Sequence, residues 1–167
     1  MRRKASFPPI ADTSTRIVIL GSLPGEESLR QRQYYAHPQN RFWELVGGAI
    51  GIELRALDYD NRLATLLECG IGLWDVIADA RRTGSLDSAI REEASNDLAA
   101  FVATLPALAA IAFNGKKAAA IGRKKLGAAG DKYRLIDLPS SSPAYAAMPF
   151  VEKQRLWSAI GETANAL

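Results

Sequence analysis

Short apolar runs alternate along the chain with segments of helical periodicity. Residues 16–21 form a β-branched apolar run that stops at Gly21, which is typical of a buried parallel strand. Residues 108–113 and 133–138 predict two further strands, and residues 71–76 predict a short strand or an extended segment. Apolar residues at helical spacing predict helices at residues 40–50, 59–68, 96–104, 115–126 and from Pro149 onward. The alternation indicates an α/β fold with helices layered on a sheet.

Length and composition indicate one folded domain. The chain has 167 residues, 48% hydrophobic and 23% charged, which is too apolar for a disordered chain. We expect a single domain over residues 14–167 and a mobile leader at residues 1–13. No apolar run reaches the roughly 18 to 20 residues that cross a bilayer, and no secretory signal opens the sequence. We therefore expect a cytoplasmic protein without a membrane partner.

Cysteine, histidine and charge narrow the possible chemistry. One cysteine, Cys69, and one histidine, His37, cannot alone form a disulfide or fill a zinc shell, so we expect no metal site. The net charge is +3, and residues 98–130 contain no acidic side chain. That interval holds Lys116, Lys117, Arg123, Lys124 and Lys125. Such a basic stretch either solvates the protein surface or contacts a polyanion.

Three loops directly follow predicted strands, at residues 21–25, 113–117 and 138–144. Ligands of open α/β sheets bind beyond the carboxyl ends of the strands, so in a parallel sheet these loops converge. The first loop lacks the Gly-Lys-Ser/Thr ending of a P-loop and the third glycine of a dinucleotide fingerprint, so a nucleotide cofactor fits poorly. The last loop carries three serines between prolines, which suits phosphate contacts, a wedge into a duplex, or a plain surface turn.

The segment at residues 34–43 clusters aromatic and carboxamide side chains ahead of a predicted helix. Asn40 is placed either to cap that helix or to serve a site. Phe42 and Trp43 have the spacing of core residues, whereas Tyr35 is free to offer its ring to a base.

Taken together, these segments resemble the uracil-DNA glycosylase superfamily, in particular the branch of mismatch-specific uracil/thymine and hypoxanthine-DNA glycosylases. The resemblance rests on residues 21–25, on the His-Pro-Gln-Asn-Arg-Phe-Trp string at 37–43, and on residues 113–116 and 138–143. It implies a three-layer α/β/α domain with a central four-stranded parallel sheet. It also implies a hydrolase that needs no cofactor or metal and acts on DNA containing deaminated bases. We expect a monomer, although the sequence leaves the oligomeric state open.

The resemblance assigns roles to individual residues. Asn40 is expected to position the attacking water as the catalytic group. The base pocket is expected to comprise Gly21, Ser22, Leu23, Pro24, Tyr35, His37 and Asn114. Contacts to DNA are expected from Ser140, Ser141, Ser142, Pro143, Ala144, Lys116 and Lys117.

Two positions depart from the mismatch-specific enzymes. Leu23 stands where those enzymes have the asparagine that positions the water. The hypoxanthine branch also has an apolar residue at this place, and the asparagine of its His-Pro-Gln-Asn string is proposed as the catalytic group. In this chain that asparagine is Asn40. Ala144 falls in the wedge region and is a poor wedge. The chemistry tolerates few ionisable groups, because leaving-base stabilisation and a placed water suffice, each typically contributing on the order of 100 to 1,000-fold.

Other interpretations stay open from the sequence. Glu26 or Glu27 could activate the water instead of Asn40, because carboxylates are stronger bases. Leu23 is also compatible with a catalytically inactive DNA-binding or damage-sensing module on the same scaffold. A nucleotide hydrolase that uses the same loops ranks last, because no cluster of metal-binding carboxylates accompanies them.

Overall fold

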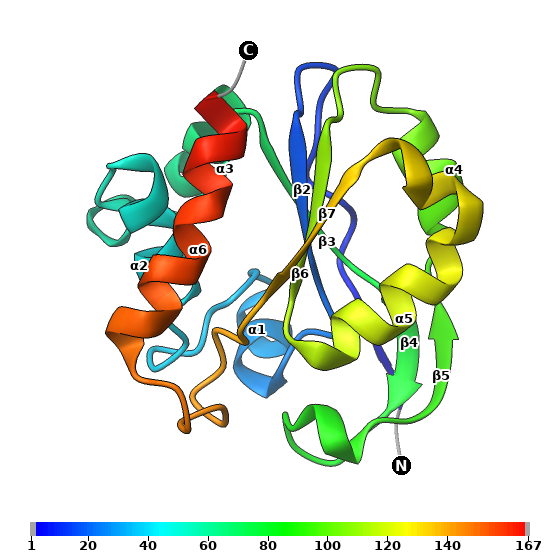
Figure 1. Ribbon diagram of the computed structural model, residues 1–167. Helices are drawn as coiled ribbons and strands as arrows, with labels where there is room; N and C mark the ends of the chain where they lie inside the picture. Colours follow the sequence, from blue (N-terminus) through cyan, green and yellow to red (C-terminus); the bar gives the residue numbers. More distant parts are fainter. Residues whose placement is uncertain (1–2, 166–167) are drawn as a thin grey trace.

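The computed structural model describes residues 3–165 and confirms the layered α/β architecture (Figure 1). The strands are β1 (Arg3–Ala5), β2 (Ile17–Gly21), β3 (Ile71–Asp75), β4 (Ile77–Arg81), β5 (Arg91–Ser95), β6 (Ala110–Asn114) and β7 (Arg134–Leu138). The α-helices are α1 (Glu26–Gln31), α2 (Phe42–Ile50), α3 (Tyr59–Glu68), α4 (Leu98–Ala103), α5 (Lys116–Leu126) and α6 (Phe150–Asn165). Short 3-10 turns are η1 (Leu54–Ala56), η2 (Asp87–Ala89) and η3 (Gly127–Lys132).

The central sheet has four parallel strands in the order β3-β2-β6-β7. Successive side chains of β2 point to opposite faces, as the period of a strand requires. Ile17 and Ile19 belong to one core cluster with residues of α2, α3 and α6, whereas Val18 and Leu20 belong to another with residues of α4 and α5. Figure 1 shows these two helical layers on either side of the sheet. The fully apolar β2 is therefore covered on both faces, which agrees with its continuous apolar run.

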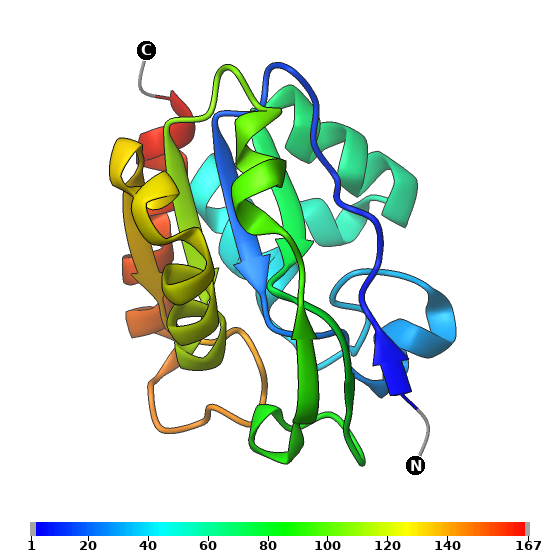
Figure 2. The same cartoon turned by 90° about the vertical axis from the view of Figure 1, so that its right-hand side faces the viewer.

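The parallel arrangement brings the carboxyl ends of all four central strands to one edge. In Figures 1 and 2 this is the lower edge, where α1, the segment after β4 and the segment after β7 gather. This convergence was expected from the three strand-end loops, and it places their residues around one site.

The N-terminal segment differs from the expected mobile leader. Where it is described, it is packed on the domain: β1 pairs antiparallel with β4, which pairs with β5 in a second, three-stranded sheet. Ile10 exchanges backbone hydrogen bonds with Leu73, and the Trp74 indole N–H donates to the Phe7 carbonyl at 2.9 Å. Residues 1–2 of the predicted leader lie outside the described residues.

Three local predictions also need correction. α1 is a helix in a segment for which no helix was predicted, and β4 is a strand in a segment for which no strand was predicted. α4 begins at Leu98 rather than at residue 96, because Asp97 caps it by accepting from the Ala100 N–H at 3.1 Å. β4 and β5 are short and carry charged residues, so their apolar pattern is too weak to mark them as strands. None of the helices within residues 3–165 combines the length and apolarity needed to cross a membrane.

Candidate active site

A cavity of about 540 Å³ opens at the carboxyl edge of the central sheet. This volume lies within the range of about 300 to 1,000 Å³ that small-molecule sites occupy. Its walls come from the first loop and α1, the segment before α2, the end of β3, the segment after β4, and the loops after β6 and β7. It is lined by residues 21–28, 34, 35, 37, 40, 75, 85–88, 114 and 140–145. An open parallel sheet with such a cavity at this edge defines a protein that binds a small ligand there.

The first loop forms one wall of the cavity through its backbone. Gly21 leaves room for two polar groups, because a Cβ at this position would lie 2.6 Å from Asp75 Oδ1 and 2.8 Å from the Tyr35 hydroxyl. Ser22 donates a hydrogen bond to Asp87 Oδ1 at 2.6 Å. Leu23 is 7% exposed and belongs to the apolar core cluster on the α4 and α5 side of the sheet. Its side chain therefore stabilises the loop and cannot hold a water.

Asp75, which sequence reasoning missed, supplies a buried carboxyl group to the cavity floor. It is the last residue of β3, pairs in register with Gly21 of β2, and is 4% exposed. Its Oδ2 atom finds no hydrogen-bond partner among the described residues. Burial raises the pKa of Asp75 to about 7, repulsion from Asp87 adds to this, and Arg82 opposes it. The group is neutral below about pH 7 and can then donate a hydrogen bond.

Tyr35 and Asn114 line the cavity beside this carboxyl group. The Tyr35 ring stacks on Phe42 with centroids 3.8 Å apart and an interplanar angle of 12°, so one face of the ring is already covered. Burial, and to a smaller extent the charge of Asp75, raise the pKa of the Tyr35 hydroxyl. The neighbouring Asn114 amide opposes this rise only in part. The Asn114 amide forms two hydrogen bonds with Ser141, both at 2.9 Å: its Nδ2 donates to Ser141 Oγ, and its Oδ1 accepts the Ser141 backbone N–H. Asn114 therefore ties the loop after β7 to the end of β6.

Asn40 lies higher on the cavity wall and is half-buried. Its Oδ1 accepts the backbone N–H of Phe42, the first residue of α2, at 2.9 Å, although the N-cap residue itself is Arg41. The amide therefore satisfies one N–H at the helix start as well as lining the cavity. A carbonyl oxygen has two lone pairs, and one remains for a water in the cavity. His37 is exposed at the cavity mouth, and its Nδ1 accepts the Gln39 N–H at 3.1 Å.

The two glutamates of the first loop also line the cavity, but both have cationic or amide partners. A hydrogen bond from Lys4 lowers the pKa of Glu26. Glu27 accepts hydrogen bonds from Arg30 and Gln31 on its own helix. The lowered pKa makes Glu26 a weaker base, and the carboxylate of Glu27 is engaged by its hydrogen bonds, so the geometry disfavours both as activators of water.

The serine loop combines a buried anchor with an exposed tip. Ser141 was expected to hold a phosphate, but it is 1% exposed and bonded to Asn114, while its carbonyl accepts the Arg41 N–H at 3.0 Å. The hydroxyls of Ser140 and Ser142 accept local backbone N–H groups at 3.1 and 3.2 Å. Pro143 and Ala144 are exposed at the tip. Of the three serines, Ser140 and Ser142 remain candidates for phosphate contacts.

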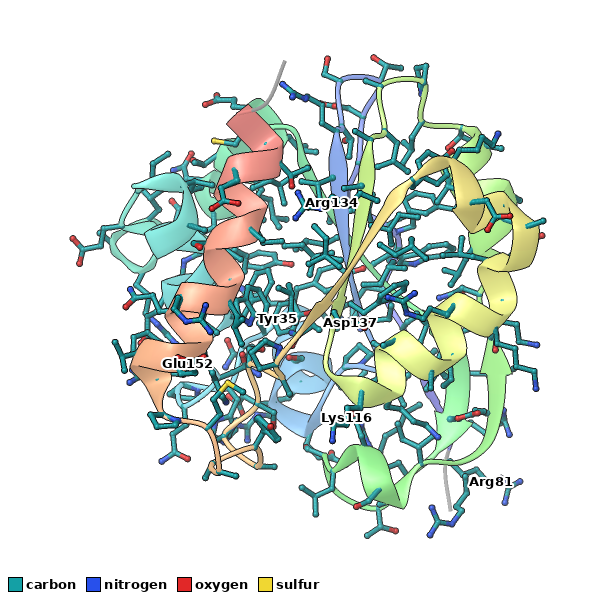
Figure 3. All side chains as sticks on the ribbon, viewed as in Figure 1. Tyr35, Arg81, Lys116, Arg134, Asp137 and Glu152 are labelled. Carbon is teal, nitrogen blue, oxygen red and sulfur yellow. The ribbon has the colours of Figure 1, made fainter. Side chains whose placement is uncertain are left out.

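The two lysines predicted to contact DNA begin α5, outside the cavity lining. Lys117 forms an ion pair with Glu93 of β5 at 3.2 Å. Lys116 is exposed, and Figure 3 shows it at the outer start of α5, whereas Tyr35 lies inside the molecule on the α6 side of the sheet. Lys116 is therefore the better placed of the two to meet a polyanion.

Replacing Asp75 by asparagine should stabilise the folded protein above neutral pH. The carboxyl has a pKa of about 7 in the folded protein, against 3.8 for an unperturbed aspartate, so wild type loses stability as pH rises through this interval. The asparagine variant escapes this loss, which amounts to at most about 4 kcal/mol. Unfolding free energies of both proteins, measured between pH 4 and 8, should diverge with rising pH and then run parallel. Constant separation across that range would contradict a raised pKa.

Comparison with known proteins shows the family of this chain. Residues 8–161 match the family model described as the uracil DNA glycosylase superfamily. A hypoxanthine DNA glycosylase of Methanosarcina acetivorans is 46% identical over 141 residues, covering 84% of this chain and 87% of the relative. One from Methanosarcina barkeri is 46% identical over 115 residues, covering 69% and 73%. A solution NMR structure from M. acetivorans, assigned provisionally to uracil DNA glycosylases, superposes with a TM-score of 0.86 at 41% identity, covering 99% of this chain and all of that one.

The chain belongs to the uracil-DNA glycosylase superfamily, whose members are base-excision-repair enzymes that hydrolyse N-glycosidic bonds in DNA. This confirms the family, the fold and the enzyme class predicted from the sequence.

Proposed function

We propose that this DNA glycosylase removes hypoxanthine from deaminated DNA, with uracil as the second candidate base, by hydrolysis without a covalent intermediate. The observation that carries the proposal is the buried carboxyl of Asp75 with an unpartnered oxygen at the floor of a base-sized cavity. The two Methanosarcina relatives named hypoxanthine DNA glycosylase support the choice of base.

The depth at which a group lies in the cavity indicates whether it would contact the base or the sugar. A nucleotide flipped from DNA enters base first, so the base reaches the floor while the sugar stays near the mouth. Asp75 is the more deeply buried group, whereas Asn40 and His37 lie closer to solvent. Asp75 therefore faces the base, and Asn40 faces the sugar and the water.

A neutral Asp75 matches the edge of a deaminated base. A protonated carboxyl offers one donor and one acceptor. Deamination creates a carbonyl beside a ring N–H, as O6 and N1–H in hypoxanthine or O4 and N3–H in uracil. The Asp75 O–H would donate to that carbonyl, and its other oxygen would accept from the ring N–H. The same donor stabilises the negative charge that the base carries as it departs.

Asn40 would hold the hydrolytic water on the sugar side. The water donates one hydrogen to the free lone pair of Asn40 Oδ1, which turns a water lone pair toward the anomeric carbon. The helix bond from the Phe42 N–H fixes that oxygen in place, so capping and catalysis use the same group. The attacking water loses its proton after the sugar–base bond has largely broken, and the departed base anion takes up a proton in turn, so a strong protein base is not required.

A panel of oligonucleotides tests the substrate. Each carries one deoxyinosine, deoxyuridine, deoxyxanthosine or mismatched thymine, and alkali cleaves any abasic site that the protein leaves. We expect strand cleavage at deoxyinosine and slower or no cleavage at the others. Binding without cleavage at any lesion would instead indicate the inactive damage-sensing module.

Monomeric state and cytoplasmic location remain predictions from the sequence.

A further inference from the structure

A second cavity of about 760 Å³ adjoins the candidate active site. Its walls come from the N-terminal segment between Arg3 and Ile10, from α1 and the residues that follow it, and from α3. Figure 2 shows the N-terminal segment passing α3 and ending with β1 beside α1. Glu26 and Tyr34 line both cavities, so the two cavities are direct neighbours. The proposed function leaves the second cavity without a role.

Aromatic and aliphatic side chains line the interior of this second cavity. Phe7, Leu29 and Tyr59 are half-buried and contribute to its lining. The Phe7 ring meets Tyr34 edge to face at an interplanar angle of 81°. The Tyr59 ring meets Trp43 in the same way at 90°, and within residues 3–165 no aromatic ring stacks face to face on Phe7 or Tyr59. Such a lining suits a flat, largely apolar group, and a nucleobase is one.

Three cationic side chains line the second cavity against one acidic side chain. Arg3 forms an ion pair with Asp79, and Lys4 forms one with Glu26, the acidic residue of the lining. Arg32 is exposed and forms no ion pair or side-chain hydrogen bond with any residue between 3 and 165. The lining therefore carries net positive charge and one unengaged guanidinium. A phosphate is the anion that matches the fork of donors on an arginine.

The backbone of Arg32 gives a further indication of a ligand. Arg32 ends α1 in the left-handed region, with φ 55° and ψ 44°. Glycine and asparagine adopt this conformation at lower cost than arginine does. Strained residues of this kind concentrate at ligand sites, where the side chain has a function that outweighs the strain. We therefore attribute a binding role to the Arg32 side chain.

We propose that the second cavity binds an unpaired nucleotide of the substrate strand while the damaged nucleotide occupies the first cavity. The base of this nucleotide would lie against Phe7 and Tyr59, and its phosphate would accept hydrogen bonds from Arg32. DNA is the occupant because the lining combines aromatic rings with positive charge and adjoins the site at which a DNA glycosylase holds its substrate. The proposal rests on the proposed function for the choice of lesion. A single-stranded flank reaches the cavity directly, whereas a paired flank would first have to open.

The first test measures the binding of single-stranded oligonucleotides by fluorescence anisotropy. Their lesion is a 2′-fluorinated deoxyinosine, in which the fluorine destabilises a cationic sugar so that the base stays attached. When nucleotides are trimmed one at a time from each end, affinity should drop in a step at one nucleotide on one side of the lesion. Replacing that nucleotide by an abasic residue keeps the phosphate and removes the base. We expect this replacement to weaken binding by at least about fivefold, because base–aromatic stacking is lost.

Substitutions of Arg32 test the phosphate contact. Arg32→Asn removes the charge but suits the left-handed backbone, so its thermal unfolding midpoint should not fall. Its affinity for single strands should fall by about threefold or more, and the slope of log affinity against log salt concentration should shrink by about 0.7. Arg32→Lys should restore the slope because it restores the charge. Lys132→Ala removes an exposed cation from η3, at the opposite edge of the central sheet, and as the matched control should leave affinity and slope unchanged.

Several results would overturn the second site: no step on either side of the lesion, full affinity with the abasic residue, or an unchanged salt slope in Arg32→Asn. An equal loss of affinity for fully paired DNA in Arg32→Asn would also overturn it, because Arg32 would then contact any DNA backbone. These measurements record binding and do not depend on excision. If wild type releases no base from any lesion while the step and its dependence on Arg32 persist, the proposed function fails and the second site stands.

Discussion

Replacing Asn40 by alanine is expected to slow single-turnover excision of deoxyinosine by about 100 to 1,000-fold. The substitution removes the oxygen that would hold the water, and it also removes the acceptor for the Phe42 N–H. The lost helix cap accounts for about 1 kcal/mol of stability, which thermal unfolding measures separately. The rate loss should persist at temperatures where the variant is fully folded.

Two further variants separate capping from catalysis at this position. Asn40→Asp keeps an oxygen for the helix N–H and a lone pair for water, so it should retain most of the excision rate. Asn40→Ser can still accept the helix N–H, but its oxygen lies one bond closer to the backbone and does not reach the position of the water. We therefore expect Asn40→Ser to be nearly as slow as Asn40→Ala. Full activity of the serine variant would mean that Asn40 is a helix cap only.

The second large effect concerns Asp75 and pH. Asp75→Ala should lower the excision rate at pH 6 by about 100 to 1,000-fold, because it removes the donor to the departing base. In wild type the rate should fall as pH rises through about 7, since the carboxyl then ionises, stops donating, and repels the negative charge on the base. Asp75→Asn cannot ionise, so it should lose this pH dependence while retaining part of the rate through its amide N–H.

The direction of the pH profile discriminates between two roles for this carboxyl. A neutral donor to the base gives a rate that declines above about pH 7. A general base that activates water gives a rate that climbs through the same range. A climbing profile that Asp75→Asn abolishes would reassign Asp75 to the water and remove the need for Asn40 in that role.

Much of the scaffold was predictable because it rests on local patterns. The helix at Tyr59–Glu68 and the strands at β2, β6 and β7 follow from apolar spacing and from glycine or proline at their ends. The convergence of the strand-end loops followed from parallel strand direction alone. β1, β4 and β5 were missed because charged residues interrupt their short apolar stretches, and their strand structure depends on the pairing of β4 with both β1 and β5.

The site was predictable in its first and last loops and not in its floor. An aspartate after the apolar run at residues 71–74 was the available signal for Asp75, but a strand-end aspartate usually lies in solvent. Its burial depends on the register that places it beside Gly21, and on Tyr35, which lies 40 residues before it along the chain. The second cavity gave no signal either, since its walls come from segments that are separate along the chain and meet only in the folded protein.

The sequence by itself determined the class of fold, the family and the edge of the sheet at which the cavity opens, because periodicity and short motifs are properties of neighbouring residues. Only the tertiary structure decided which side chains share the cavity, which carboxyl is neutral and which cations line the second cavity. Those properties arise from burial and from partners that are distant along the chain. The shifted pKa of a carboxyl and the exposed fraction of a side chain are therefore set only when folding brings these partners together.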